Sequence, residues 1–248
     1  MSTTAPSNKA PSTAMVLAAG LGKRMRPITD TIPKPLVRIA GKTLLDWGLD
    51  SLAEAGVTKA VVNVHYLPDQ IVAHLGSRAV PRIDISDESG GLLDSAGGIV
   101  KALPQLGGEP FYILNADTFW IDAEESNLRR LALAWDAGSM DILLMLADLD
   151  SATGHSGGTD FLVDADGRLR RAAGSQDGLI YAGAAIVNPA LFKDAAIEPH
   201  SLNRYFDTAI AAGRLHGMAM NGRWITVGTP DAIPAAEAAV EKALAQGV

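Results

Sequence analysis

Segments typical of buried strands and segments with helical periodicity alternate along the first part of this chain. Residues 59–64 (KAVVNV) are mostly apolar, whereas residues 43–55 place leucines at helical spacing and end before Gly56. Strands joined through helices pair in parallel, because each helix returns the chain to the same end of the sheet. The order therefore predicts an α/β protein with a doubly wound, mostly parallel, Rossmann-like sheet. The predicted strands are residues 14–18, 59–64, 82–86, 111–114 and 140–147, and the predicted helices are residues 43–55, 68–75, 96–103 and 128–137.

The pattern changes after residue 160. The turn sequence DADG (residues 164–167) lies between two short strand-like runs and predicts a hairpin. No repeat and no long Pro/Gly linker divides the chain, so residues 14–248 are predicted to form one domain with a small hairpin-rich subregion on the same sheet. The predicted elements here are strands at 161–163, 168–171, 180–187, 215–220 and 223–227, a helix at 201–211 with Ser201 as its N-cap, and a final helix at 230–245 with Pro230 in its first turn.

The first thirteen residues, MSTTAPSNKAPST, are rich in Ser, Thr, Ala and Pro and lack the apolar core of a signal peptide. We predict that residues 1–13 form a disordered tail. No segment of the sequence approaches the roughly 18 apolar residues that a membrane-spanning helix needs. These features favour a cytoplasmic protein without a membrane partner.

Charge and cysteine content exclude several classes of function. The net charge is −7, and nucleic-acid-binding proteins usually carry a broad basic face, so we expect no nucleic-acid partner. The chain contains no cysteine, which excludes disulfides and thiolate metal sites. We expect a monomer or a small homo-oligomer.

A glycine turn surrounded by cations follows the first predicted strand. The sequence VLAAGLGKRMRPITDTIPKPL (residues 16–36) places Gly20 and Gly22 at the end of the strand, with Lys23, Arg24 and Lys34 after them. Glycines allow backbone N–H groups to approach an anion closely, and the cations supply opposite charge. The combination predicts a loop that binds a polyphosphate.

Three kinds of glycine loop compete at this position. A dinucleotide-binding fingerprint needs a third small residue where this chain has Met25, and Pro27 disfavours the helix that should begin there. A P-loop needs the pattern GxxxxGK[ST], which the sequence lacks. The third interpretation is an irregular loop that wraps around phosphates and continues through Pro27 and Pro33. The alternative without a ligand is a basic surface loop after a buried strand.

This segment resembles the N-terminal motif of the sugar-1-phosphate nucleotidyltransferases, LAAGxGxRMxPxTxxxPKP. The resemblance extends from residue 14 to residue 236. It implies the nucleotide-diphospho-sugar transferase fold and an enzyme that transfers a nucleoside monophosphate to a sugar 1-phosphate, with release of pyrophosphate. The residues that match the motif are Leu17, Ala18, Ala19, Gly20, Gly22, Arg24, Met25, Pro27, Thr29, Pro33, Lys34 and Pro35.

Two further segments narrow the resemblance. The sequences LPQLGGEPFYILNAD (residues 103–117) and VNPALF (residues 187–192) are most similar to family members that act on N-acetylmuramate 1-phosphate in peptidoglycan recycling. The resemblance then implies UTP and this sugar phosphate as substrates. Mannose- or heptose-1-phosphate guanylyltransferases and glucose-1-phosphate thymidylyl- or uridylyltransferases remain alternatives, because backbone amides can bind uracil, thymine and guanine. A regulatory nucleotide-binding protein is the alternative from another class.

The resemblance assigns Mg²⁺ to Asp117, which follows the predicted strand at 111–114. Ligands of open α/β sheets bind at the carboxyl ends of the strands, although an Asp there can also cap a helix. The sequence RWITVGTP (residues 223–230) is similar to the family segment WxDVGTP, but Thr226 replaces the metal-binding Asp. Either Mg²⁺ relies on Asp117, phosphates and water, or another carboxylate such as Asp207 substitutes for the missing one.

The resemblance also implies roles for individual residues in nucleotide binding and catalysis. The predicted catalytic residues are Arg24, which neutralises the departing phosphates, Lys34, which lies over the α-phosphate, and Asp117. We expect Gly97 and Gly98, at a helix start, to leave N–H groups free and room for a flat base. The predicted nucleotide-binding residues are Leu17, Ala18, Ala19, Gly20, Gly22, Lys23, Glu88, Ser95, Gly97 and Gly98.

Sugar recognition is assigned to Asn115, two residues before Asp117, and to the hairpin-rich subregion. The predicted sugar-binding residues are Asn115, Asp160, Tyr181 and Gly183. We expect Arg170 and Arg171 to form a solvated strand end rather than to bind a substrate carboxylate.

Overall fold

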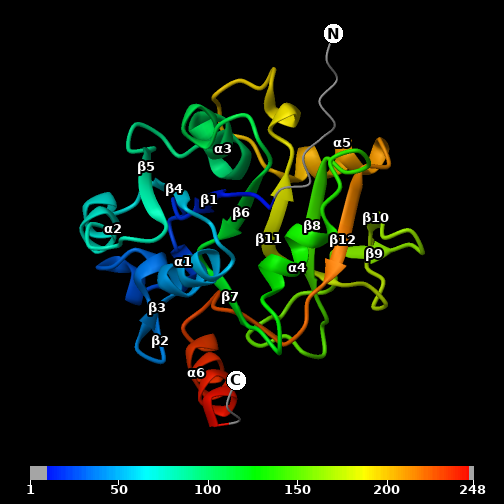
Figure 1. The fold of residues 1–248 in the computed structure, drawn as a ribbon. Helices are drawn as coiled ribbons and strands as arrows, with labels where there is room; N and C mark the ends of the chain where they lie inside the picture. The colour runs from blue at the N-terminus through cyan, green and yellow to red at the C-terminus, as the bar shows by residue number, and fades with distance from the viewer. Residues whose placement is uncertain (1–9, 246–248) are drawn as a thin grey trace.

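A central sheet of seven strands organises the computed structural model, which describes residues 10–245 (Figure 1). The strands are β1 (Thr13–Leu17), β4 (Lys59–Val64), β5 (Arg82–Asp87), β6 (Phe111–Asn115), β8 (Ile142–Ala147), β11 (Ile180–Val187) and β12 (Leu215–Ala219). Their order in the sheet is β12-β8-β11-β6-β1-β4-β5. Neighbouring strands pair in parallel except at β11, which is antiparallel to both β6 and β8. The predicted α/β class and the mostly parallel sheet are confirmed.

Helices cover both faces of this sheet, because successive side chains of each strand point to opposite sides. In β1, Val16 belongs to the apolar core that includes residues of α1 (Leu44–Glu54), α2 (Pro68–Leu75) and α4 (Asn127–Ala134). The neighbouring Met15 belongs to the core formed with α3 (Asp94–Leu106) and α5 (Asn203–Ala211). Burial of these two sets of apolar side chains is the main favourable contribution to folding.

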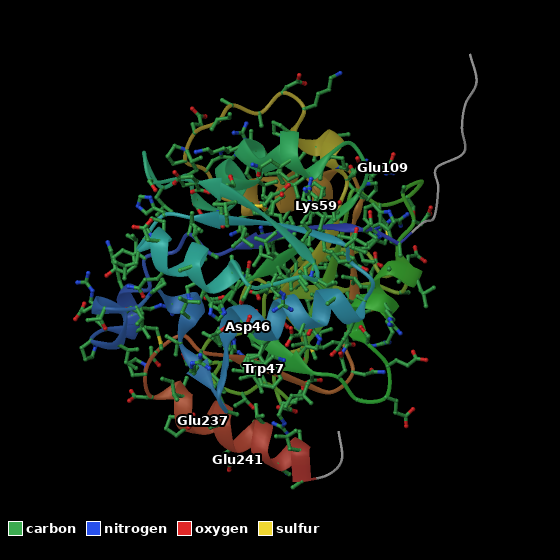
Figure 2. All side chains as sticks on the ribbon, turned by 60° about the vertical axis from the view of Figure 1, so that its left-hand side comes forward. Asp46, Trp47, Lys59, Glu109, Glu237 and Glu241 are labelled. Carbon is green, nitrogen blue, oxygen red and sulfur yellow. The ribbon has the colours of Figure 1, made fainter. Side chains whose placement is uncertain are left out.

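A third apolar cluster packs the C-terminal helix α6 (Ala232–Ala245) against β7 (Thr118–Ile121), which pairs with β13 (Arg223–Thr226). Trp47 of α1 stacks on Phe119 of β7 with ring centroids 4.8 Å apart, and Figure 2 shows Trp47 on the side of α1 that faces α6. The remaining short elements are β2 (Arg38–Ile39), β3 (Lys42–Thr43), β9 (Phe161–Val163), β10 (Leu169–Arg171), and the 3-10 turns η1 (Lys23–Met25), η2 (Ile28–Asp30), η3 (Lys34–Leu36) and η4 (Pro189–Phe192).

Several predictions about the later elements need correction. The hairpin β9–β10 forms a separate two-stranded sheet and not a part of the central one, and Figure 1 shows it at the edge of the molecule. Ser201 is not the N-cap of α5, because that helix begins at Asn203 after Leu202. Pro230 precedes α6, which begins at Ala232. The short strand β7 was not predicted.

The predicted tail lies mostly outside the described residues. Its last residue, Thr13, is the first residue of β1. The carbonyl oxygen of Ser12 accepts a hydrogen bond from the backbone N–H of Thr58 at 3.0 Å. The sheet therefore begins one residue before the predicted boundary. None of the helices between residues 10 and 245 combines the length and the apolar composition that a membrane span requires.

Candidate active site

A cavity of about 270 Å³ opens at the carboxyl ends of β1, β4 and β6. Parallel strands end at the same edge of a sheet, so the loops that follow them meet there. We call this space the first cavity. Its lining residues are Leu17, Ala18, Ala19, Gly20, Lys34, Pro35, Asn63, Leu92, Asp94, Ser95, Asn115, Ala116 and Asp117. The structure thus brings seven of the predicted catalytic and nucleotide-binding residues to one surface: Leu17, Ala18, Ala19, Gly20, Lys34, Ser95 and Asp117.

The glycine loop continues into single turns of 3-10 helix, and no α-helix begins where a dinucleotide-binding fingerprint requires one. Gly22 has a φ of 59°, and a Cβ atom there would lie 3.0 Å from Thr29 Cγ2 and 3.1 Å from Lys34 Cβ. The hydroxyl of Thr29 donates a hydrogen bond to the Gly22 carbonyl at 2.8 Å. A left-handed backbone in so little space favours glycine, and it folds the loop back over Lys34.

Lys34 and Asp117 form an ion pair in the first cavity. The Lys34 Nζ atom donates to Asp117 Oδ2 at 2.7 Å, with 11% of the lysine side chain and 40% of the aspartate side chain exposed. An ammonium group in such a sheltered position interacts strongly with anions, because water screens it poorly. The pair places one cation and one potential metal ligand side by side at the cavity wall.

Two predicted phosphate-binding residues, Lys23 and Arg24, are absent from the lining that the described residues give the first cavity. Lys23 and Arg24 are exposed. The Arg24 guanidinium lies beside Gly228, since Nη1 would be 3.7 Å from a Cβ atom at that position. Arg24 therefore borders the segment that follows β13, on the same side of the molecule as Thr226.

A buried network of hydrogen bonds connects the loops that form the first cavity. The Asn63 side chain accepts a hydrogen bond from the Ala18 N–H at 2.7 Å and donates one to Glu88 Oε1 at 2.7 Å. The other oxygen of Glu88 accepts the Leu93 N–H at 3.0 Å, and Glu88 has no exposed surface. The predicted nucleotide-binding residue Glu88 thus ties the loop after β1 to the loop before α3. Sequence reasoning missed Asn63, although a polar residue in the apolar run KAVVNV was a signal.

Gly97 and Gly98 serve close packing. A Cβ atom at Gly98 would lie 2.6 Å from Glu88 Oε1 and 2.8 Å from Asn63 Nδ2, and one at Gly97 would collide with the Glu198 carbonyl. The expectation of a free N–H group was wrong for Gly97, because this N–H donates to the His200 carbonyl at 3.3 Å. The segment before α5 occupies the beginning of α3, which a sequence pattern cannot show.

Thr226 lies next to Asp117, as the family resemblance implies. Strand β13 pairs with β7 so that Thr226 is opposite Thr118, and the Val227 N–H donates to the Asp117 carbonyl at 3.3 Å. Asp207, the suggested replacement ligand, instead accepts a hydrogen bond from Arg171 at 2.9 Å. Within the described part of the chain, no cluster of three His, Asp or Glu residues could hold a metal ion. Asp94 also lines the first cavity, but Asp117 is the carboxylate beside Lys34 and Thr226, where it could hold a metal together with oxygens of a bound ligand.

A second cavity of about 250 Å³ adjoins the first, and the two share Leu17, Ser95 and Asn115. Three of the four predicted sugar-binding residues line it: Asn115, Asp160 and Tyr181. Gly183, the fourth, has a φ of 81° and lies under Asn115, where a Cβ atom would be 3.2 Å from the Asn115 Cβ. The other lining residues are Phe161, Arg171, Ser201, Leu202, Asn203 and Phe206.

Tyr181 contributes to the lining of the second cavity and positions Asp160 there. Its hydroxyl oxygen is buried and has no hydrogen-bond partner among the described residues. Burial raises the pKa of Tyr181, so the hydroxyl keeps its proton at neutral pH. The Tyr181 N–H donates to Asp160 Oδ2 at 2.8 Å, which holds that carboxylate at the cavity. Buried polar atoms are normally paired, so the Tyr181 hydroxyl is an exception among the described residues.

Arg171 departs from the expectation of a solvated strand end. Its neighbour Arg170 is exposed, but Arg171 lines the second cavity, with 37% of its side chain exposed. Its guanidinium lies over the Phe161 ring, 4.9 Å from the centroid. The sequence offered no signal for this difference beyond the alternation of side chains along a strand.

Comparison with known proteins gives the following matches. The MobA-like NTP transferase domain matches residues 14–160. N-acetylmuramate alpha-1-phosphate uridylyltransferase of Caulobacter vibrioides is 44% identical over 241 residues, covering 95% of this chain and 100% of that protein. The enzyme of the same name from Neisseria meningitidis is 36% identical over 222 residues, with coverage of 87% and 93%. The mannose-1-phosphate guanyltransferase of Aspergillus fumigatus is 32% identical over 230 residues, with coverage of 88% and 61%.

Solved structures agree on the fold. The inositol-1-phosphate CTP transferase from T. maritima superposes with a TM-score of 0.73 at 20% identity, over 94% of this chain and 96% of that one. A UDP-glucose pyrophosphorylase complexed with UDP-glucose also gives 0.73, at 18% identity and with coverage of 93% and 99%. The predicted nucleotide-diphospho-sugar transferase fold is thereby confirmed.

Proposed function

Since this chain belongs to the MobA-like NTP transferase family and is a nucleotidyltransferase, we propose that it transfers UMP from UTP to N-acetylmuramate 1-phosphate. The products are the UDP-sugar and pyrophosphate. The observation that carries the proposal is the pair of adjoining cavities, which share Leu17, Ser95 and Asn115, with Lys34 and Asp117 in the wall of the first. Identity of 44% over nearly the whole chain supports the choice of base and sugar.

The geometry supports a direct transfer. An oxygen of the sugar 1-phosphate attacks the α-phosphorus of UTP, a new P–O bond forms, and the bond to the β-phosphate breaks so that pyrophosphate leaves. This step needs no covalent nucleophile from the protein. Catalysis then consists of positioning the two phosphates and neutralising their charge.

Individual residues have separate tasks in this scheme. The backbone of Ala18 and Gly20 lines the first cavity, and the bond from Ala18 N–H to Asn63 fixes the end of β1 there. We assign the α-phosphate and the attacking phosphate to Lys34, whose sheltered ammonium stabilises charge that develops between them. We assign the departing pyrophosphate to Arg24. This residue is exposed and does not line the first cavity, and its guanidinium lies beside Gly228.

Magnesium belongs to the proposal through Asp117. Asp117 at the cavity wall suits Mg²⁺, which binds through one or two carboxylates plus phosphates and water. When bound, Mg²⁺ acts as a Lewis acid on phosphate oxygens. Thr226, beside Asp117, offers a hydroxyl that can hold a metal-bound water but adds no charge.

The biological setting follows from the substrates. A uridylyltransferase for N-acetylmuramate 1-phosphate reuses a sugar of the cell wall, which supports a role in peptidoglycan recycling. UTP is made in the cytoplasm, so we also propose a cytoplasmic location. The mannose-1-phosphate guanyltransferase relative makes GTP with mannose 1-phosphate the second candidate pair.

A matrix of substrates tests the proposal. Pyrophosphate release is measured with UTP, GTP, dTTP and CTP, each against the 1-phosphates of N-acetylmuramate, mannose and glucose. Rapid release with UTP and N-acetylmuramate 1-phosphate alone supports the proposed reaction. Release only with GTP and mannose 1-phosphate would replace it by the second candidate.

A further inference from the structure

Two cations lie in different parts of the joined cavities. Lys34 lines the first cavity and not the second, whereas Arg171 lines the second and not the first. Leu17, Ser95 and Asn115 line both cavities and mark the place where the two adjoin. A ligand that extends from one cavity into the other therefore meets one positive group with each of its ends. This arrangement suits a molecule with two separate anionic groups.

The surroundings of Arg171 fix the direction of its guanidinium. Nε and Nη2 both approach Asp207 Oδ1, at 2.9 Å and 2.8 Å. Nη2 also donates to the Asn203 side chain at 3.0 Å. The rings of Phe161 and Phe206 lie 4.9 Å and 5.8 Å from the guanidinium carbon. Contacts from α5 and from two aromatic rings thus hold the group in one orientation beside the cavity.

Part of the guanidinium remains available to a ligand. A guanidinium has five N–H donors, and the contacts above use those of Nε and Nη2. Nη1 makes no hydrogen bond to any residue between 10 and 245. Asp207 compensates the charge only in part, because 62% of its side chain is exposed to water. A planar group fixed in this way binds a carboxylate better than a mobile lysine does.

The identity of the two anions follows from the reaction. The 1-phosphate of the sugar must lie near Lys34 and Asp117, where UTP is attacked, so it cannot also occupy the neighbourhood of Arg171. The group near Arg171 must therefore be an anion elsewhere on the sugar. N-acetylmuramate differs from N-acetylglucosamine by a lactyl ether on C3, which ends in a carboxylate.

We propose that Arg171 binds the lactyl carboxylate of N-acetylmuramate 1-phosphate and thereby selects this acidic sugar phosphate over N-acetylglucosamine 1-phosphate. The inference rests on the proposed function and adds a residue that determines specificity. Asp207 and Asn203 act through Arg171 as positioning residues.

The test compares two sugar phosphates with UTP as the common donor. Pyrophosphate release is measured with N-acetylmuramate 1-phosphate and with N-acetylglucosamine 1-phosphate for the wild-type protein, Arg171→Met and Arg170→Met. The second variant is the matched control, because Arg170 is the exposed neighbour on the same strand. Melting temperatures of all three proteins show whether either substitution destabilises the fold by loosening the β9–β10 hairpin.

We expect Arg171→Met to lower kcat/KM for N-acetylmuramate 1-phosphate by about a hundredfold, mainly through KM, as loss of a charged hydrogen-bond partner does. The rate with N-acetylglucosamine 1-phosphate and the KM for UTP should change little, and Arg170→Met should match the wild-type protein. Asp207→Asn should give an intermediate loss of discrimination, because it loosens the guanidinium without removing it.

Three results would overturn the inference. An equal loss with both sugar phosphates in Arg171→Met would mean that Arg171 only fastens the hairpin to α5. An Arg171→Met variant that uses N-acetylmuramate 1-phosphate as well as the wild-type protein does would reject the role of Arg171 but keep the proposed function. A wild-type protein that uses neither compound would reject both.

Discussion

Lys34 and Asp117 are separated by 83 positions in the sequence, yet the Lys34 ammonium lies 2.7 Å from a carboxylate oxygen of Asp117. The first residue belongs to the loop after β1 and the second follows β6, and these strands are neighbours in the sheet. Parallel pairing brings both strand ends to one edge, so the contact follows from the topology.

Lys34→Ala should lower kcat by on the order of a hundredfold if, as we propose, the ammonium stabilises charge that develops during transfer. The fall should appear in single-turnover pyrophosphate release at saturating UTP. Lys34→Arg keeps the charge with a different shape and serves as the comparison. Near-normal turnover in Lys34→Ala would show that another group neutralises the α-phosphate.

Arg24→Ala should lower kcat more than Arg26→Ala does. Arg26 pairs with Asp30 on the surface at 3.2 Å, and exposed pairs of this kind contribute little to stability or binding. Arg24 lies beside Gly228 near the first cavity, and we expect about a hundredfold loss when its charge is removed. Steady-state rates of pyrophosphate release by the two variants test this difference in kcat. Equal rates would remove Arg24 from the catalytic residues.

Gly98→Ala should destabilise the protein although alanine favours helices over glycine by about 1 kcal/mol. The added methyl group would lie 2.6 Å from Glu88 Oε1 and would disturb its bond to Asn63, at a cost of about 1–3 kcal/mol. The free energy of unfolding is measured by urea titration, with UTP affinity measured in parallel. Gly90→Ala is the control, because a Cβ atom there has no neighbour within 4 Å. A more stable Gly98→Ala variant would contradict this account of the network.

Thr226→Asp should reduce the Mg²⁺ concentration needed for half-maximal rate by about tenfold, since a second carboxylate raises the affinity of a Mg²⁺ site. Thr226→Asn has a similar size without the charge and should leave the requirement unchanged. Magnesium titrations of pyrophosphate release, with EDTA to establish the zero point, give the comparison. An unchanged requirement in the Asp variant would mean that position 226 does not reach the metal.

The ion pairs of Asp50 should make stability depend on pH. Burial alone would raise the pKa of Asp50, but hydrogen bonds and charges from Lys42 and Arg78 outweigh it and lower the pKa below 3.8. The unfolded chain then binds more protons than the folded one at acid pH, so stability falls as pH drops from 3.8 through the folded-state pKa. At neutral pH the contribution is about 1 kcal/mol or less, because the Asp50 side chain is partly exposed.

Urea unfolding of the wild-type protein and Asp50→Asn at neutral and strongly acid pH measures this contribution. The difference between the two proteins should be present at neutral pH and should shrink in acid. Asp166→Asn is the control, because 74% of the Asp166 side chain is exposed in its pair with Arg168. A difference that grows in acid would reverse the assigned direction.

Local patterns predicted most of the fold. Strand β4, helix α2 and strand β11 have the predicted boundaries, because each combines a clear apolar period with an abrupt end. Strand β7 escaped prediction because it has only four residues and takes its pairing from β13, about a hundred positions later. The beginning of α5 was placed too early because the Leu202 N–H donates to Ser95 of α3, and the Ser201 hydroxyl accepts a hydrogen bond from the nearby Asn203 N–H without capping the helix.

The sequence by itself determined the order of strands and helices and the chemistry of the glycine loop, because both depend on residues close together in the chain. Tertiary structure alone decided that Asn63 and Glu88 support the first cavity and that Arg171, and not Arg170, lines the second. These assignments depend on which distant segments pack together. The physical reason is that burial and hydrogen bonding act between residues that are neighbours in space. The positions of two residues in the chain do not by themselves specify whether they become such neighbours.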